Sequence, residues 1–196
     1  RLFTDIGNLM TRNAQEMSWD YQKATAISCE GFLEENVTKS KACWCCPWPS
    51  CQKLYTVRKG PYAGFKGGNY WAGQPITFGS GIDNGDLDLL LVLSGLCNQY
   101  GLDIFHVGFT LMWAMECFER GILTRADTEG LELRFGACKP EELVGLVRKI
   151  ALKQGFGELL ALGCSEAARR IGKGAEKYCL ASKGQEVEAI AERNIL

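Results

Sequence analysis

DLDLLLVLSGLCNQYGLDIFHVGFTLMWAMECFER, residues 86–120, sets the fold class of this 196-residue chain. Its first part is acidic at the start, apolar through LLLVL and followed by Gly101, which predicts a helix over residues 86–100. Residues 104–120 are apolar on nearly every helical face, so we expect a second helix deep in the core. Two such helices joined by a short turn indicate a mostly α protein.

The neighbouring segments extend this pattern. Residues 139–154, with Pro140 in the first turn, and residues 157–171, followed by Gly172, both show the apolar stripe of an amphipathic helix. The remaining expectations are short helices at 19–33 and 36–42, an extended piece at 53–60, and irregular chain at 1–16 and 60–81. We therefore predict an irregular, mostly α domain with a loop-rich, cysteine-bearing shoulder.

Composition and charge argue against several classes of protein. The formal net charge is -1, and acidic and basic residues are interleaved, so nothing favours a nucleic-acid or membrane-surface partner. The most apolar runs, residues 87–93 and 109–115, are too short to span a bilayer. We expect no nucleic acid and no membrane among the partners.

Ten cysteines are unusual for a chain of this length. Four of them fall in KACWCCPWPSCQKLY, residues 41–55, and the other six occur singly in or beside helical patterns. Lone cysteines in such places usually behave as small buried hydrophobic residues. We therefore expect a reduced, cytoplasmic protein.

The dense cysteine loop suggests a metal site. Cys43 and Cys46 have the C-x2-C spacing that lets two thiolates reach one metal centre, and Cys51 follows in the same loop. Trp44 and Trp48 are placed to shield such a centre from water. An iron–sulfur cluster, a zinc site, and disulfides or free thiols all remain open, although zinc usually takes two C-x2-C pairs.

Seven motifs in family order resemble the tungsten-dependent aldehyde:ferredoxin oxidoreductase family. They are TRNAQE (11–16), the cysteine loop, LCNQYGLD (96–103), AMECFERGILTRADTEGLELRFG (114–136), GFGELLALG (155–163), ARRIGKGAEKY (168–178) and KGQEVE (183–188). The resemblance implies that residues 1–196 are the central and C-terminal helical domain of a larger multi-domain enzyme. Residues 43–51 would be its iron–sulfur loop, 60–81 a glycine-rich loop and 83–182 the helical core. An N-terminal tungstopterin lobe and a C-terminal lobe would be absent.

The resemblance also implies site residues. Cys43, Cys46 and Cys51 would hold a 4Fe-4S cluster, with a fourth ligand from Cys45 or from outside the chain. The pterin motif of a tungsten or molybdenum bis-pterin would fall on Asn98, Gly101, Leu102 and Asp103. The residues alone favour a plainer interpretation, in which Gly101 ends one helix and Asp103 caps the next.

The implied activity is oxidation of a small aldehyde-like substrate to a carboxylic acid. Electrons would pass through the cluster to ferredoxin or another electron-carrier protein, and a homodimer is a further option. Two positions depart from the family pattern: Asn69 replaces a glutamate, and LASKG (180–184) lacks a histidine. His106, the chain's one histidine, is expected to be a satisfied helix residue rather than a catalyst.

Three alternative functions remain. One is a tungsten-dependent reductase of benzoyl-CoA-type aromatic rings, in which Cys97 is the candidate for a cysteine close to the metal. The second is a zinc-stabilised helical module that binds another protein without catalysis, and the third is a scaffold that has lost its cofactors. Iron with acid-labile sulfide, one equivalent of zinc, or neither metal would distinguish these cases.

Overall fold

The computed structural model describes residues 5, 7, 9–48, 52–68 and 73–186. Its elements, in chain order, are α2 (Tyr21–Ala26), α3 (Cys29–Glu35), β1 (Val37–Lys41), β2 (Gln52–Thr56), β3 (Lys66–Gly68), α4 (Gly73–Thr77), η1 (Ser80–Ile82), α5 (Leu87–Tyr100), α6 (Ile104–Glu119), α7 (Pro140–Leu152), α8 (Phe156–Leu160), α9 (Cys164–Ile171), η2 (Ala175–Tyr178), β4 (Ala181–Ser182) and β5 (Gln185–Glu186). This confirms the mostly α class, with a small sheet added.

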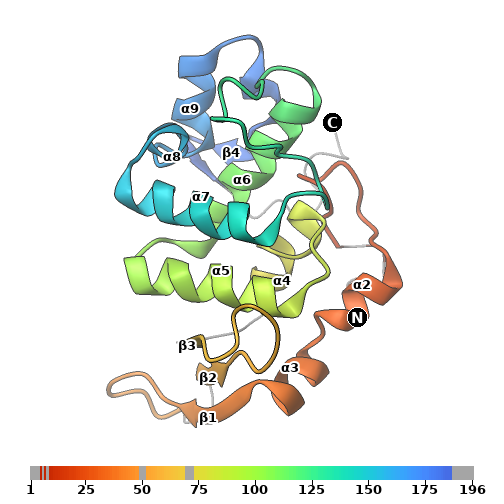
Figure 1. Cartoon of the computed structure of the whole chain (residues 1–196), viewed down its shortest axis with the longest axis vertical. Coiled ribbons are helices and arrows are strands. Elements are labelled where there is room, and N and C mark those ends of the chain that lie inside the picture. The colour runs from red at the N-terminus through yellow and green to blue at the C-terminus, as the bar shows by residue number, and fades with distance from the viewer. Residues whose placement is uncertain (1–4, 6, 8, 49–51, 69–72, 187–196) are drawn as a thin grey trace.

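The described elements form a helical body with small β structures at its two ends. In Figure 1 the antiparallel sheet β1-β2-β3 lies at one end, and α8, α9 and the β4-β5 hairpin lie at the other. Between them lie α5, α6 and α7, where α5 contacts both β3 and α7. The N-terminal segment runs along the side of this body.

Helix α5 begins and ends, and helix α7 begins, where the sequence predicts. The Asp86 carboxylate caps α5 by accepting hydrogen bonds from the N–H groups of Asp88 (2.9 Å) and Leu89 (3.2 Å). Gly101 ends α5 in the left-handed conformation, with φ +68°, which glycine adopts without steric cost. Pro140 likewise starts α7 at its first turn, as predicted.

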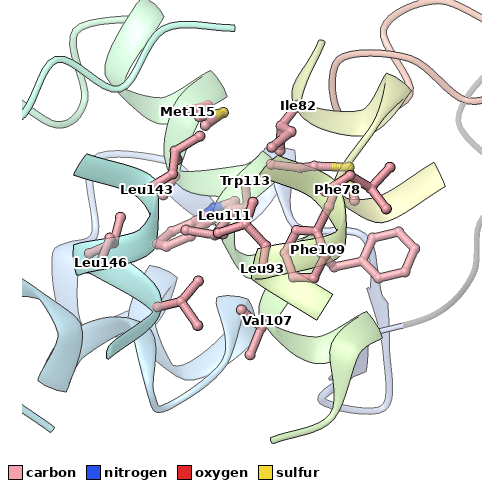
Figure 2. Close-up of a cluster of buried hydrophobic side chains, with 14 of the residues drawn as sticks. Phe78, Ile82, Leu93, Val107, Phe109, Leu111, Trp113, Met115, Leu143 and Leu146 are labelled. Atoms are coloured by element: carbon pink, nitrogen blue, oxygen red, sulfur yellow. The ribbon is translucent and has the colours of Figure 1, made fainter. Parts of the chain in front are cut away.

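Helix α6 is the centre of the hydrophobic core, as its sequence predicts. Residues 107–118 are all buried, including Trp113, whose indole N–H donates to the carbonyl of Ala175 at 3.0 Å. In Figure 2 side chains from α5, α6 and α7 meet here, among them Leu93, Trp113 and Leu143. Burial on every side explains why this helix shows no polar face.

The expected helix at 36–42 is wrong, because this segment forms strand β1. It pairs with β2, with Val37 opposite Tyr55 and Lys41 opposite Gln52. Tyr55 is buried and donates its hydroxyl hydrogen bond to the carbonyl of Leu91 at 2.7 Å, which holds the sheet against α5. Strand pairing between segments distant in sequence overrides the local helix propensity of Lys and Ala.

Three further boundaries differ from the predictions. The segment 157–171 is two helices, α8 and α9, separated at Gly163 (φ +78°). The segment 19–33 is divided into α2 and α3, because Ser28 caps a new helix by accepting from the N–H of Gly31. The glycine-rich stretch 60–81 contains β3, α4 and η1 rather than irregular chain alone.

The segment 9–16 is irregular, as expected, yet it is well packed. Leu9, Met10 and Ala14 are buried in the core, and the backbone N–H of Arg12 donates to the carbonyl of Ser80 at 3.1 Å. No described helix combines the length and the hydropathy that a membrane span requires.

Candidate functional site

The β1-β2 hairpin presents the cysteine loop. The paired strands end at Lys41 and Gln52, so residues 42–51 form the connection between them. Within it the N–H of Cys46 donates to the carbonyl of Cys43 at 3.1 Å, and Cys45 has φ +56°. Cys43 and Cys46 are therefore the two ends of one tight turn, whereas Cys51 lies outside the described residues.

The loop is open to solvent in the described part of the chain. Cys43 and Cys45 are exposed and Cys46 is half-buried, while Trp44 is 94% and Trp48 66% exposed. The expectation that the indoles shield the sulfurs is therefore not met within the described residues. The physical reason is that the loop projects beyond the helical body, where no described element covers it.

The donor chemistry of this loop fits a thiolate-bound metal, but as a partial site. Among the described residues no three His, Cys, Asp or Glu side chains are grouped so that they could hold a metal ion. Cys43 and Cys46 supply two soft sulfur donors, and further ligands would have to include Cys51 or groups beyond the described part. Iron–sulfur clusters and zinc both accept such donors.

The four residues of the expected pterin motif come together in the α5-α6 turn. Asp103 caps α6 by accepting from the N–H of His106 at 2.9 Å, and Gly101 ends α5. The Asn98 side chain donates to the carbonyl of Gly68 at 2.9 Å. Asn98 and Asp103 are exposed and Leu102 is half-buried, so the turn performs the plain capping roles and still presents a carboxylate to solvent.

A direct connection joins this turn to the cysteine hairpin. The sequence had indicated two separate motifs. Gly68, the acceptor for Asn98, belongs to β3, and Leu54 of β2 pairs with it. Gln99 donates to the carbonyl of Lys66 in the same strand at 3.5 Å. Strand β2 leads straight back to the cysteine loop, so one small sheet links the two motifs.

Cys97 lies in the core rather than on a surface. Its side chain is fully buried, and burial, with a smaller contribution from the charge of Asp103, raises its pKa to about 12. Such a thiol stays protonated at neutral pH and behaves as a small hydrophobic residue. Asn69, at the position where the resemblance implies a glutamate, lies outside the described residues.

Two cysteines predicted to be lone and reduced are joined. Cys164, at the start of α9, forms a disulfide with Cys179, which follows η2. Helix α9 packs against η2, which brings together two positions that no local pattern relates. Cys97 and Cys117 match the prediction of buried free cysteines, whereas Cys29 is exposed.

The charge distribution along the chain is asymmetric, which was not predicted. The segment 37–82 carries Lys39, Lys41, Lys53, Arg58, Lys59 and Lys66, but none of the chain's 23 acidic residues. The expectation of interleaved charges is therefore wrong for this segment, although a charge count along the chain would have revealed it. Most of these cations lie in or next to the three-stranded sheet, and Lys59 pairs with Glu35 outside the segment at 3.2 Å.

A second missed feature is the partner of His106. Its Nδ1 lies 2.7 Å from Oε2 of Glu186, a carboxylate from the β4-β5 hairpin that is almost fully buried. The sequence offers no local signal for this pair, because the two residues are far apart in the chain. The expectation that His106 is a satisfied helix residue agrees with its place in α6 and with this contact, although the partner itself was not predicted.

Comparison with known proteins identifies the family. The family model described as "Aldehyde ferredoxin oxidoreductase, domains 2 & 3" matches residues 1–196. The tungsten-containing aldehyde ferredoxin oxidoreductase of Pyrococcus abyssi is 30% identical over 195 residues, which are 98% of this chain and 30% of that protein. The aliphatic sulfonate oxidoreductase WOR-like subunit of Pyrococcus furiosus is 34% identical over 192 residues, 94% of this chain and 29% of that protein.

A solved structure has the same fold. The active site complex BamBC of benzoyl coenzyme A reductase, with bound 1,5-dienoyl-CoA, superimposes with a TM-score of 0.71 and 26% identity over 90% of this chain and 26% of that one. The chain thus spans about 30% of the length of the curated relatives it matches. With a family match over its whole length, the chain belongs to the aldehyde ferredoxin oxidoreductase family.

Proposed function

We propose that this chain is part of a tungstopterin oxidoreductase that oxidises an aldehyde to a carboxylic acid and passes the electrons through a 4Fe-4S cluster to ferredoxin. The observation that carries the proposal is the link between the two motifs. Asn98 of the α5-α6 turn bonds β3 at 2.9 Å, and β3 pairs with the strand that leaves the cysteine loop. An electron relay needs its two centres held at a constant separation, and a shared sheet supports that.

In this proposal the chain holds both the iron–sulfur cluster and the pterin near one end of α5. Cys43, Cys46 and Cys51 would bind the cluster, with Cys45 or a residue outside the chain as the fourth ligand. Asn98, Gly101, Leu102 and Asp103 would contact the pterin, where the Asp103 carboxylate accepts hydrogen bonds and Gly101 allows close approach of the backbone. When bound, tungsten or molybdenum supplies two-electron chemistry and the cluster one-electron transfer.

The domain organisation follows from the same proposal. Residues 43–51 act as the iron–sulfur loop and 83–182 as the helical core, within a longer cytoplasmic protein whose other lobes cover the open loop. Cover of this kind would exclude water from the cluster and so affect its reduction potential. Trp44 and Trp48, which are exposed here, offer apolar surface for that contact.

The charge asymmetry supports an acidic electron carrier as the partner. Lys39 and Lys41 occupy exposed positions of β1, directly beside the cysteine loop, and Lys53 lies on the paired strand. A basic surface around a redox centre attracts an acidic protein and speeds productive encounter. Ferredoxin or another carrier of that charge fits this surface.

A second candidate is reduction of an aromatic ring carried as a benzoyl-CoA-type thioester. The observation that favours it is the TM-score of 0.71 with the BamBC complex. The burial of Cys97 leaves this reaction without the cysteine that the sequence suggested for it. Assays of the protein from the intact gene with simple aldehydes and with benzoyl-CoA distinguish the two reactions.

Metal analysis of anaerobically purified protein tests the cluster. We expect about four irons with acid-labile sulfide per cluster, lost when Cys43, Cys46 and Cys51 are all replaced by serine. The matched control is Cys29→Ser, an exposed free cysteine outside the loop, which should keep the iron. One equivalent of zinc would favour the protein-binding module, and iron retained in the triple variant would refute the ligand assignment.

A further inference from the structure

A pocket lies at the start of α6, beside the α5-α6 turn, and two residues of that turn, Leu102 and Asp103, belong to its lining. Its volume is about 240 Å³, and its wall is formed by the first turns of α6, the end of α7, helix α8 and the β4-β5 hairpin. Apolar side chains such as Leu102, Ile150 and Leu160 line it, together with the polar groups of His106 and Glu186. A small concave site with few polar groups is typical of a site for a small organic molecule.

The polar groups of this pocket form an ordered pair. The Glu186 carboxylate is 2% exposed and uses both oxygens: Oε1 accepts from the N–H of Cys164 at 2.7 Å, and Oε2 lies 2.7 Å from Nδ1 of His106. A carboxylate held from two sides fixes the orientation of the imidazole. The imidazole itself is 43% exposed, and its Nε2 has no bonding partner among the described residues.

This arrangement is chemically specific. A buried carboxylate next to one ring nitrogen favours a proton on that nitrogen and makes the opposite nitrogen the basic one. That leaves Nε2 of His106 as a proton acceptor at the wall of the pocket. The remaining charged groups around the pocket are Asp103, which caps α6, and Lys153, which ends α7; α8 contributes only apolar side chains to the lining.

We propose that this pocket binds a small carbonyl compound and that His106, oriented by Glu186, is its acid–base residue. The reaction that we assign to this pocket rests on the function proposed above. Oxidation of an aldehyde with one water gives a carboxylic acid, two electrons and two protons. The two electrons leave one at a time and reduce two molecules of a one-electron carrier protein. Nε2 of His106 accepts one proton and returns it to solvent, and the other proton passes to bulk water. The apolar wall holds the hydrocarbon part of the substrate.

The first test is independent of turnover. Diethyl pyrocarbonate reacts with a neutral imidazole, and mass spectrometry locates the modified residue in the protein from the intact gene. We expect His106 to be modified, and propionate, a probe for the carboxylate product, to slow this modification several-fold. Equal modification with and without propionate would overturn the pocket assignment. Protection in a protein that oxidises no aldehyde would support the pocket and overturn only the proposed reaction.

The second test concerns the acid–base role. In His106→Gln we expect kcat/KM for aldehyde oxidation to fall by about 100-fold or more and the limb of the pH profile that reports this base to disappear, with metal content unchanged. Glu186→Gln removes the carboxylate that orients the ring, so kcat should fall while KM changes little.

The control for Glu186→Gln is Glu158→Gln, an exposed glutamate of α8, which should leave kcat and KM unchanged. Because Glu186 also holds the start of α9, the thermal midpoint of each variant is measured alongside. A His106→Gln protein with the wild-type pH profile would overturn the acid–base role.

Discussion

Asp103 shows how one residue serves a structural role and remains available for another. Its Oδ1 accepts the N–H of His106 at 2.9 Å, which satisfies one of the free backbone donors at the start of α6. The residue is nevertheless exposed, next to the left-handed Gly101. Capping and cofactor contact are compatible at this position, so they must be separated by substitution.

Two substitutions at Asp103 separate these roles. Asparagine caps helices about as well as aspartate, so Asp103→Asn should leave the free energy of unfolding nearly unchanged, whereas Asp103→Ala should lower it by about 1 kcal/mol. If the carboxylate contacts the pterin, both variants should bind less tungsten or molybdenum, as measured by elemental analysis. An Asp103→Asn protein with full metal content would leave only the capping role.

At the scale of elements, Asp83 ties the N-terminal segment to the helical body. Its carboxylate, which follows η1, accepts from the indole N–H of Trp19 (2.7 Å) and from Lys23 Nζ (2.8 Å) on one oxygen, and from Arg12 Nη2 (2.8 Å) on the other. Burial alone would raise the pKa of Asp83, but hydrogen bonds from Lys23, Trp19 and Arg12 outweigh it and lower that pKa below its usual value.

This ion-pair cluster predicts a specific acid sensitivity. Because the folded-state pKa of Asp83 is lowered, its contribution to stability is complete above the unfolded value of about 3.9 and is lost as pH falls through the folded value. Asp83→Asn should therefore lower the free energy of unfolding at pH 7 by about 1–3 kcal/mol and flatten its dependence on pH below about 4.

Thermal or urea unfolding of the protein from the intact gene across this pH range measures the effect. Glu158→Gln serves again as the control, since that residue is exposed. An Asp83→Asn protein whose stability falls with acid as steeply as the wild type would contradict the assignment.

Elements were predictable where the signal is local. The starts of α5, α6 and α7 follow from Asp86, Asp103 and Pro140, and the end of α5 follows from Gly101, because these residues act on backbone groups within one turn. Strand β1 was mistaken for a helix because its partner, β2, lies beyond the cysteine loop. The break at Gly163 was missed because a glycine inside an apolar pattern is compatible with either a continuous or a divided helix.

On the scale of the whole molecule, one end differs from the rest in charge. Residues 37–82, most of which lie at the sheet end, include no acidic residue in 46 positions. The formal net charge of the whole chain is only -1. The helical remainder is therefore acidic. In Figure 1 the sheet lies at the end of the body opposite α9, so the molecule presents a basic end that carries the cysteine loop.

This asymmetry predicts salt-dependent electron transfer. Replacing Lys39 and Lys41 together by glutamine should lower the rate of ferredoxin reduction at low ionic strength several-fold and weaken its dependence on salt. The matched control replaces Lys177 and Lys183, two exposed lysines near the other end, by glutamine. It should change neither the rate of ferredoxin reduction nor its dependence on salt. Stopped-flow measurement over a range of salt concentrations reads both effects; equal losses in the two double variants would argue against a docking role for the sheet.

Local sequence was enough to specify the mostly α class, the caps of the central helices and the two motifs that suggest cofactors, because these depend on residues within a few positions of one another. The assembled fold alone determined that β1 is a strand, that Cys164 bonds Cys179, that β3 joins the cysteine hairpin to the α5-α6 turn, and that Glu186 meets His106. Each of these contacts joins residues far apart in the chain. Such contacts form only when the core brings the elements together, and no pattern within a single segment encodes them.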